Sequence, residues 1–192
     1  MVDVLLSAAA RVLVKHGYDD TSTNRIAQVA GVSVGSLYQY FPNKEAIVAA
    51  LIERHDGEMW STFTRLAAAC AGEPLAKSTW VVLDALFEAH LIEPALHRVL
   101  HEQVPRVGKL SRLRETNKKA RELVAGILRA QAHEIDVRDV DAAAFVIVEA
   151  VEALIHQSIE LPDVDADTIK REAAILVLRY LRVSGASDRR IG

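Results

Sequence analysis

Residues 21–44, TSTNRIAQVAGVSVGSLYQYFPNK, constrain the fold more than any other stretch of this sequence. Ile26 and Ala27 give the first part of the stretch an apolar helical face. Gly31 follows where the chain must turn sharply, and glycine adopts a positive φ there without steric cost. Ser33 then stands where a side-chain oxygen accepts a hydrogen bond from an unpaired N–H of a new helix. The stretch therefore predicts two short helices joined by a tight turn.

The second of these helices, here called the recognition helix, points Leu37 and Phe41 toward the core at four-residue spacing, and Pro42 ends it. Its outward side is shaped to enter the major groove of DNA, because it carries small, hydroxyl, amide and phenol groups. Two helices at a steep angle also occur as ordinary packing. No acidic residue lies between positions 21 and 44, which favours DNA binding over packing alone. The outward residues are Val34, Gly35, Ser36, Tyr38 and Gln39.

The pattern G-V-S-x-G-S-L-Y-x-Y-F-x-x-K at residues 31–44 resembles the DNA-binding domain of the TetR family of bacterial transcriptional regulators. The resemblance includes the flanking run from Gly17 to Leu51. Many family members carry lysine or another polar residue where this chain has Val34, so the base read by that position stays open. The resemblance implies DNA contacts by Thr23, Ser33, Val34, Gly35, Ser36, Tyr38, Tyr40 and Lys44.

The residue types suggest that some of these residues contact phosphates and others contact bases. Tyr38 and Lys44 are placed for phosphates, which position a protein on DNA without reading its sequence. Ser36 and Gln39 offer hydrogen-bonding groups to base edges, which carry the sequence information. We therefore expect general affinity from the first pair and operator preference from the second.

Composition predicts an all-α fold with about nine helices. Of the 192 residues 51% are hydrophobic, with nine glycines and five prolines, so the chain can bury a sizeable core. Alanine, leucine, valine, glutamate and arginine dominate, and no alternating strand pattern is long enough to compete. We expect a helix-turn-helix DNA-binding domain over residues 1–45 and a ligand-binding and dimerisation domain over residues 46–192. The later helices are expected at residues 44–71, 75–91, 94–104, 109–135, 142–161 and 165–183.

The net charge of −3 is unusual for a nucleic-acid binder. Residues 1–55 balance five lysines and arginines against five acids, and those acids lie outside the turn and the recognition helix. Cys70 is the only cysteine, so no disulfide forms within the chain and a reducing cytoplasm fits. No basic leader pattern or membrane-length apolar run is apparent, so we expect a cytoplasmic protein with no membrane contact.

The stretch 142–161 is apolar nearly all round, and such a helix must be covered on two sides. One side can face the core and the other a second copy of the chain. We therefore expect a homodimer whose recognition helices lie about 34–36 Å apart and read a palindromic double-stranded operator. The expected interface residues are Ile147, Val151, Leu154, Ile155, Leu176 and Tyr180.

Aromatic residues and a few polar groups on three helices of the second domain are typical of a ligand cavity. Aromatic residues at helical spacing also occur in a solid core, and that alternative stays open. TetR-like repressors commonly release DNA when a small molecule binds, so the resemblance implies a small apolar or amphipathic effector. The expected lining residues are Phe63, Trp80, Phe87, His90, Phe145, Glu149 and Glu152.

His97 and His101 have the four-residue spacing of a zinc-ligating pair, but the sequence pattern supplies no further ligand. There is no phosphate loop, nucleophile elbow or carboxylate pair, so no catalytic residue, metal or cofactor is assigned and an enzyme is not expected. The function we expect is that of a ligand-responsive DNA-binding transcriptional regulator, most simply a repressor. A transcriptional activator remains one alternative, and a helical small-molecule carrier or enzyme that does not act on DNA is the other.

Overall fold

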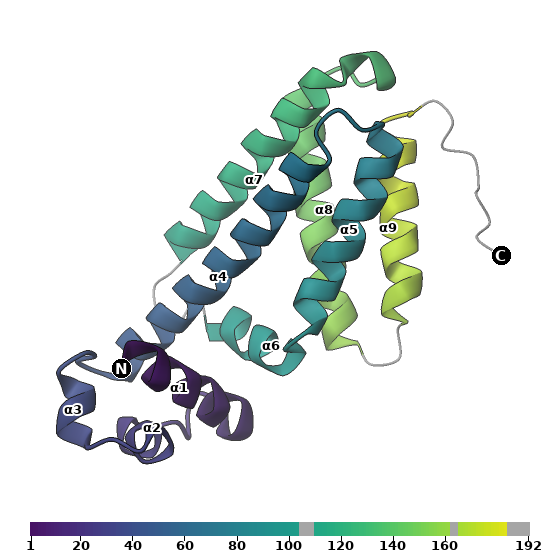
Figure 1. Cartoon of the computed structure of the whole chain (residues 1–192). Helices are drawn as coiled ribbons and strands as arrows, with labels where there is room; N and C mark the ends of the chain where they lie inside the picture. The colour runs from purple at the N-terminus through teal and green to yellow at the C-terminus, as the bar shows by residue number, and fades with distance from the viewer. Residues whose placement is uncertain (104–109, 162–164, 184–192) are drawn as a thin grey trace. The chain divides into compact units, whose positions relative to one another are not determined.

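The computed structural model describes residues 1–103, 110–161 and 165–183. These residues form nine α-helices and one short 3-10 helix, without any strand, which confirms the all-α prediction (Figure 1). The helices are α1 (Val2–His16), α2 (Thr23–Ala30), α3 (Val34–Tyr38), α4 (Lys44–Ala69), α5 (Leu75–Leu91), α6 (Pro94–Gln103), α7 (Leu110–Ala130), η1 (Ala132–Glu134), α8 (Val140–Glu160) and α9 (Ala166–Tyr180).

The end of α7 differs from the prediction of one helix to residue 135, because the chain changes there to η1. This turn brings the Glu134 carboxylate to the start of α5, where Oε2 accepts the N–H of Leu75 at 3.0 Å. The N-cap of α5 is Pro74, whose side chain makes no capping hydrogen bond. Glu134 therefore satisfies one of the N–H groups that every helix leaves unpaired at its N-terminus.

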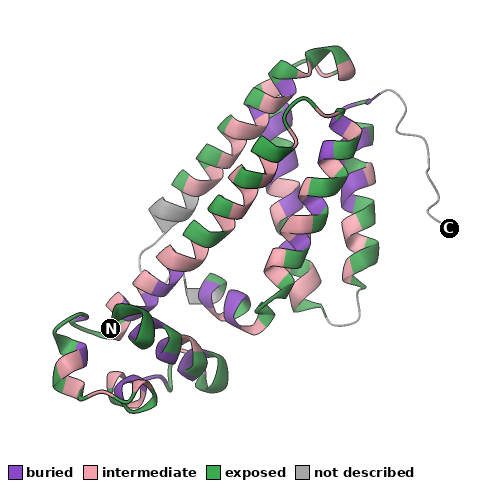
Figure 2. Ribbon diagram, viewed as in Figure 1, coloured by how far each residue is buried: buried purple, intermediate pink, exposed green. Residues whose placement is uncertain are grey.

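The chain forms two compact units that differ from a simple division at residue 45. The first unit consists of Met1–Glu58 and Glu93–Arg114, and the second of Met59–Ile92 and Glu115–Gly192. Each unit has its own cluster of buried apolar side chains. The ribbon is purple at the buried residues of both units (Figure 2). The first unit is larger than the predicted DNA-binding domain because it includes the start of α4 and all of α6.

The core of the first unit joins α6 to the N-terminal helices. Leu5 of α1, Ile26 of α2 and Leu37 of α3 are completely buried. Leu96 and Leu100 lie one turn apart on α6 and are buried in the same cluster, where α6 packs on α1. Burial of a leucine side chain stabilises a fold by about 1.5–3 kcal/mol, so α6 contributes substantially to the stability of this unit.

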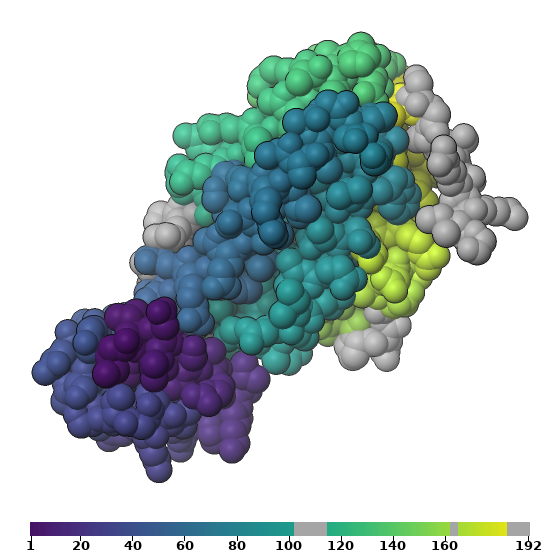
Figure 3. All heavy atoms as spheres, viewed as in Figure 1, coloured from purple at the N-terminus to yellow at the C-terminus, as the bar shows by residue number. Residues whose placement is uncertain are grey.

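The second unit is built around α5, α8 and α9. Phe87 of α5, Val151 and Ile155 of α8 and Val177 of α9 are buried in one cluster. The side chains of α5 and α9 lie side by side in the space-filling view, where α5 is teal and α9 yellow (Figure 3). Asp165 caps α9, since its Oδ2 accepts the N–H of Thr168 at 3.1 Å.

By length and composition, α8 is the one helix among the described residues that is apolar enough to cross a membrane. Glu149 and Glu152 interrupt this helix, so it contains no uncharged apolar run of membrane length. Core helices of globular proteins can have the same length and composition. One face of α8 is buried in the way expected of a core helix. The residues buried along it are Ala143, Ala144, Ile147, Val148, Val151 and Ile155.

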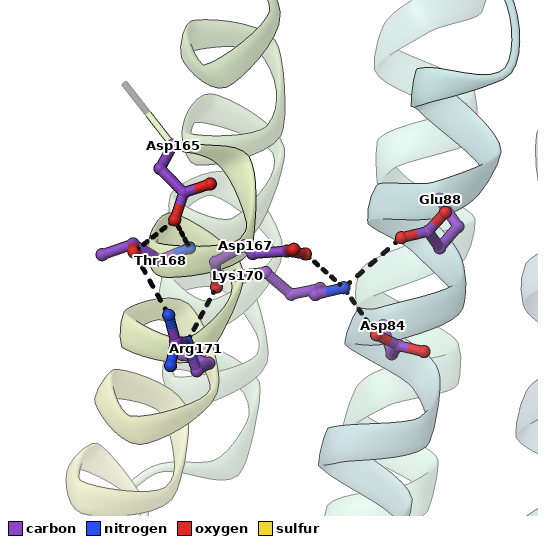
Figure 4. Close-up of polar contacts among 7 residues, drawn as sticks. All are labelled: Asp84, Glu88, Asp165, Asp167, Thr168, Lys170 and Arg171. Carbon is purple, nitrogen blue, oxygen red and sulfur yellow. Dashed lines mark hydrogen bonds and ion pairs between the residues drawn. The ribbon is translucent and has the colours of Figure 1, made fainter. Parts of the chain in front are cut away.

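An ion-pair cluster on Lys170 connects α9 to α5 (Figure 4). The Lys170 Nζ lies 2.6 Å from Asp84 Oδ1, 3.0 Å from Asp167 Oδ1 and 3.4 Å from Glu88 Oε1. Its side chain is only 14% exposed, whereas the carboxylates are 62–73% exposed. The hydrogen bond to Asp84, and then the one to Asp167, raises the pKa of Lys170 above its ordinary value. The ammonium therefore stays charged and holds three carboxylates together.

We expect Lys170→Met to lower the free energy of unfolding by about 1–2 kcal/mol, between the values for exposed and buried ion pairs. The substitution removes the attraction and leaves the three carboxylates facing one another. Lys77→Met is the matched control, because Lys77 pairs with Glu73 at 2.9 Å but is 61% exposed. That change should cost less than about 0.5 kcal/mol. Urea denaturation of both variants measures the difference, and equal losses would contradict the assignment.

Candidate nucleic-acid interface

The turn between α2 and α3 has the predicted geometry. Ile26 and Ala27 are buried on the inner face of α2. Gly31 has φ of 70°, in the left-handed region, and Val32 donates its N–H to the carbonyl of Ala27 at 3.0 Å. Ser33 Oγ accepts the N–H of Ser36 at 3.0 Å, which confirms Ser33 as the N-cap of α3. These local bonds fix the direction in which α3 leaves the turn.

The recognition helix is shorter than predicted. Regular α3 ends at Tyr38, four residues before Pro42, so Pro42 does not end it. Phe41 is nevertheless buried in the first unit's core, because the N–H groups of Tyr40 and Phe41 both bond to the Leu37 carbonyl at 3.0 Å. The turn that follows α3 therefore leads the chain back toward the core of the first unit. The exposed part of the interface is therefore short and rigidly anchored at both ends.

Most of the nine predicted DNA-binding residues lie on α3 or directly beside it. Five of the nine are exposed, whereas Thr23, Val34, Ser36 and Lys44 are half-buried. Val34 packs against the core of the first unit. The half-burial of Val34 gives its side chain a packing role at the position where relatives often carry a polar residue. The exposed predicted residues are Ser33, Gly35, Tyr38, Gln39 and Tyr40.

Two hydroxyl pairs order the polar groups of this surface. Thr23 Oγ1 at the start of α2 lies 3.1 Å from the Tyr38 hydroxyl at the end of α3. Ser33 Oγ lies 2.8 Å from Ser36 Oγ. Each hydroxyl can donate one hydrogen bond and accept two, so a paired hydroxyl keeps capacity for a further acceptor or donor. The structure thus brings Thr23 and Tyr38, fifteen residues apart in the sequence, to one place.

Lys44 begins α4 and is held against the turn that precedes α2. Its Nζ donates to the Tyr18 carbonyl at 2.9 Å and lies 4.1 Å from the centroid of the Tyr18 ring. The Tyr18 hydroxyl in turn donates to Glu45 Oε1 at 3.2 Å. Arg25 is held in a similar way, since its Nη1 donates to the Asp20 carbonyl at 2.5 Å. Both cations of residues 21–44 are therefore anchored to the segment between α1 and α2.

Tyr18 is a residue that the sequence analysis missed. It lies 26 positions before Lys44, so no helical or strand periodicity connects the two residues. The only available signal was an aromatic residue directly after Gly17, the glycine with φ of 71° that ends α1. Such a signal indicates a turn but does not identify the lysine that contacts it.

The aromatic residues predicted to line an effector cavity lie in different environments. Phe87 is 1% exposed in the second unit's core, and the half-buried Phe63 contacts Trp60 on its own helix with centroids 5.9 Å apart. Trp80 is 37% exposed and Phe145 is 51% exposed. Their positions as lining residues stay a prediction.

Polar residues of the predicted effector site lie on α5 and α8. The Nδ1 of His90 lies 2.7 Å from the Leu86 carbonyl and therefore donates to it, and the His156 ring stands edge-on with centroids 6.1 Å apart. Burial lowers the pKa of His90 despite the opposing effect of this hydrogen bond. At neutral pH its Nε2 is then an acceptor. Glu152 is half-buried on the same helix as His156.

Glu149 is engaged by a cation from α7. Arg121 Nη1 lies 3.0 Å from Glu149 Oε1. The same guanidinium lies over Phe145, 5.3 Å from the ring centroid. Arg121 is 29% exposed, so this contact is only partly screened by water. Glu149 thus has a charged partner on another helix of the second unit.

The predicted dimer residues separate into two groups. Ile147, Val151 and Ile155 are at most 8% exposed and belong to the core of their own unit, so assigning them to an outward face was wrong. The physical reason is that an all-apolar helix has no polar side to show which face is inward. Leu154 is half-buried beside this core. Leu176 and Tyr180 of α9 are 46% and 40% exposed, respectively.

The histidine pair His97 and His101 occupies α6. His97 is buried, and its Nδ1 shares a hydrogen bond of 2.6 Å with His55 Nε2 of α4. The His101 ring is stacked on His97 with centroids 6.4 Å apart. No group of three metal-ligating side chains with suitable geometry occurs among the residues that the structure describes. Within the described contacts, His97 joins α4 to α6 inside the first unit.

Comparison with known proteins assigns both parts of the chain. The family model for "Bacterial regulatory proteins, tetR family" matches residues 5–51, and the model for "Tetracyclin repressor-like, C-terminal domain" matches residues 74–181. The HTH-type transcriptional repressor KstR2 of Rhodococcus jostii is 28% identical over 145 residues, which cover 71% of this chain and 68% of that protein. The HTH-type transcriptional regulator YvkB of Bacillus subtilis is 40% identical over 57 residues, only 30% of the length of each protein.

A solved structure shows the same fold over nearly the whole chain. The fatty acid degradation regulator FadR from Bacillus halodurans superposes with a TM-score of 0.77 at 18% identity, covering 95% of this chain and 96% of that one. The helix-turn-helix geometry, the two-unit helical fold and the two family models agree. This chain therefore belongs to the TetR family of bacterial regulatory proteins, whose members are DNA-binding transcriptional regulators.

Proposed function

We propose that this regulator is a homodimeric repressor that binds a palindromic operator and releases it when a small apolar or amphipathic molecule binds in the second unit. The observation that carries the proposal is the exposed face of α3, where hydroxyl, phenol and amide groups surround the helix that Leu37 anchors in the core. A short helix of this kind presents its first residues to base edges in the major groove.

The charge arrangement supports DNA as the partner of this face. Residues 21–44 contain no acid, and their two cations are already ordered by backbone carbonyls. Ordering a lysine side chain costs conformational entropy. Because this lysine is already ordered in the free protein, less entropy is lost when it binds a phosphate. The nearest downstream acid, Glu45, accepts a hydrogen bond from Tyr18.

Dimerisation through α8 and α9 is supported by the apolar side chains that these helices leave exposed. Val146 on α8 is 42% exposed, and Leu176 and Tyr180 form an exposed stripe one turn apart on α9. A helical face that exposes several large apolar side chains is typical of a surface covered by a partner. A two-fold dimer would place two copies of α3 about one DNA turn apart, which fits a palindromic operator.

Effector binding in the second unit is supported by half-buried apolar and polar groups close to its core. Phe63 and His90 are half-buried, and His90 stays neutral because burial lowers its pKa. A few half-buried polar groups among apolar side chains are typical of pockets that hold a largely apolar molecule. Such a ligand relieves repression only if it prefers a conformation that binds the operator less well.

The proposal is tested by selecting operator DNA from fragments of the source genome and then measuring binding in the presence of candidate effectors. We expect a near-palindromic sequence to bind much more tightly than random DNA, and an effector to lower that affinity. Reciprocity requires operator DNA to lower effector affinity by the same factor. Equal affinity for selected and random DNA would contradict operator recognition. A ligand that binds without changing operator affinity would contradict the switch.

Two substitutions separate phosphate contacts from base contacts. Lys44→Ala should weaken binding to every sequence and reduce the slope of log affinity against log salt by about 0.9, because one counterion-releasing contact is lost.

Gln39→Ala should instead change which operator is preferred, since an exposed amide at the end of α3 can bond a base edge. Titrations of one operator and one random duplex at several salt concentrations distinguish these effects. A sequence-dependent effect of Lys44→Ala would contradict its assignment.

A further inference from the structure

Lys44 is unusual among the lysines of the described chain because it lies on an aromatic ring. Its ammonium donates to the Tyr18 carbonyl at 2.9 Å and stands 4.1 Å from the centroid of the same residue's ring. A cation within about 6 Å of a ring centroid is attracted to the ring face. Two different groups of one residue therefore hold the first residue of α4.

Tyr18 is itself fixed by its surroundings. Its carbonyl oxygen also accepts the N–H of Thr21 at 3.2 Å, and Thr21 Oγ1 donates back to the Gly17 carbonyl at 2.6 Å. Thr21 is buried, and the Tyr18 side chain packs against the core of the first unit. The segment that carries the lysine's anchor is thus a hydrogen-bonded turn, so the anchor has a defined position.

The Tyr18 hydroxyl forms a hydrogen bond with Glu45, the acidic residue directly after Lys44. It donates to Glu45 Oε1 at 3.2 Å, whereas the Lys44 ammonium bonds the carbonyl of Tyr18. An ammonium has three donors, and the Tyr18 carbonyl takes one of them. Two N–H donors of Lys44 can then point to an anion without first breaking a salt bridge to its neighbour.

We propose that Tyr18 is a positioning residue for DNA binding, which orders the Lys44 ammonium for a phosphate before DNA arrives. This inference rests on the proposed phosphate contact of Lys44. Tyr18 acts through the lysine in two ways: its ring and carbonyl fix the ammonium, and its hydroxyl holds Glu45. The benefit is entropic, because a long flexible side chain is already confined in the free protein.

The test is a double-mutant cycle with the full chain and a random-sequence duplex, since phosphate contacts act on all sequences. Tyr18→Leu should weaken binding about threefold to fivefold, as expected for loss of an exposed cation–π contact. In the Lys44→Ala background the same change should have no further effect. Both variants keep the main-chain carbonyl, but only Tyr18→Phe keeps the ring, so it should restore most of the affinity lost in Tyr18→Leu.

The salt dependence distinguishes loss of the phosphate contact from loss of the ordering of Lys44, whereas the dependence of the Tyr18 effect on Lys44 excludes a purely structural role. Tyr18→Leu should keep the wild-type slope against log salt, because Lys44 still reaches the phosphate, whereas Lys44→Ala should lower the slope by about 0.9. An equal loss from Tyr18→Leu with and without Lys44 would overturn the inference, as would no loss at all. If Tyr18→Leu does not fold, Tyr18→Met, whose unbranched side chain adapts to irregular space, takes its place in the cycle. A Lys44→Ala variant with unchanged affinity and slope would overturn the phosphate contact itself.

Discussion

Leu176→Glu is expected to yield a folded monomer that binds operator DNA at least about 100-fold more weakly than the wild type. Leu176 is 46% exposed on α9, so its replacement leaves the core of the second unit intact. In a two-fold dimer the new carboxylate would be buried at an apolar interface, where an unpaired charge is costly. Two linked half-site contacts typically exceed a single one by about 10²–10⁴ in affinity, and this gain is lost in a monomer.

Two variants control for this result. Val151→Glu places the same charge at a residue that is 6% exposed within the core, so it should unfold the second unit rather than separate two folded chains. Val81→Glu changes an α5 residue that is 42% exposed, and it should leave assembly and DNA binding unchanged. Sedimentation velocity and circular dichroism distinguish the three outcomes. A Leu176→Glu protein that remains dimeric at micromolar concentration would contradict an interface on α9.

Gly35→Leu is expected to abolish operator binding, by about 100-fold or more, while the protein remains folded. Gly35 lies in α3 without a positive φ, and a Cβ added there would meet only Ser33 Oγ, at an ordinary 3.9 Å. The fold therefore gives no reason for glycine at this exposed position. Close approach of the helix backbone to a ligand is a general reason for glycine, and here the ligand would be DNA.

The same reasoning predicts opposite effects on stability and function. Gly35→Ala should raise the free energy of unfolding by up to about 1 kcal/mol, because glycine costs helix stability, yet it should already weaken operator binding. Gly126→Leu is the matched control, since this exposed glycine of α7 has nothing within 4 Å of an added Cβ. It should keep full operator affinity. Wild-type affinity of Gly35→Leu would show that α3 does not approach DNA at this position.

Local features of the first unit could be predicted from the sequence because their partners are close in the chain. Ser33 caps α3 through a bond to Ser36, and Gly31 turns the chain through its own φ. Both depend on three or four neighbouring residues, so the residue types alone specify them. The length of α3 was not predictable in the same way. Phe41 has helical spacing from Leu37 but reaches the core through the turn that follows the helix.

Long-range features escaped prediction for physical reasons. The contact between Lys44 and Tyr18 depends on how α1 and α4 pack together, and no sequence periodicity indicates that packing. The orientation of α8 escaped because periodicity identifies an inward face only where polar residues mark the outward one. Val151 was therefore placed on the wrong side. On α9, Leu176 of the expected interface is exposed whereas the adjacent Val177 is buried, and a role of Leu176 in dimerisation stays a prediction.

The placement of α6 has a consequence for how this protein can be divided and recombined. Leu96 and Leu100 complete a core whose other buried members come from the first 52 residues, so two of its sixteen buried residues follow α5 in the sequence. A hybrid that joins the N-terminal 45 residues of this regulator to another family member's remainder would pair α1 with a foreign α6. A hybrid that keeps the operator preference of this protein must therefore include the α6 residues that pack on α1 as well as the recognition helix.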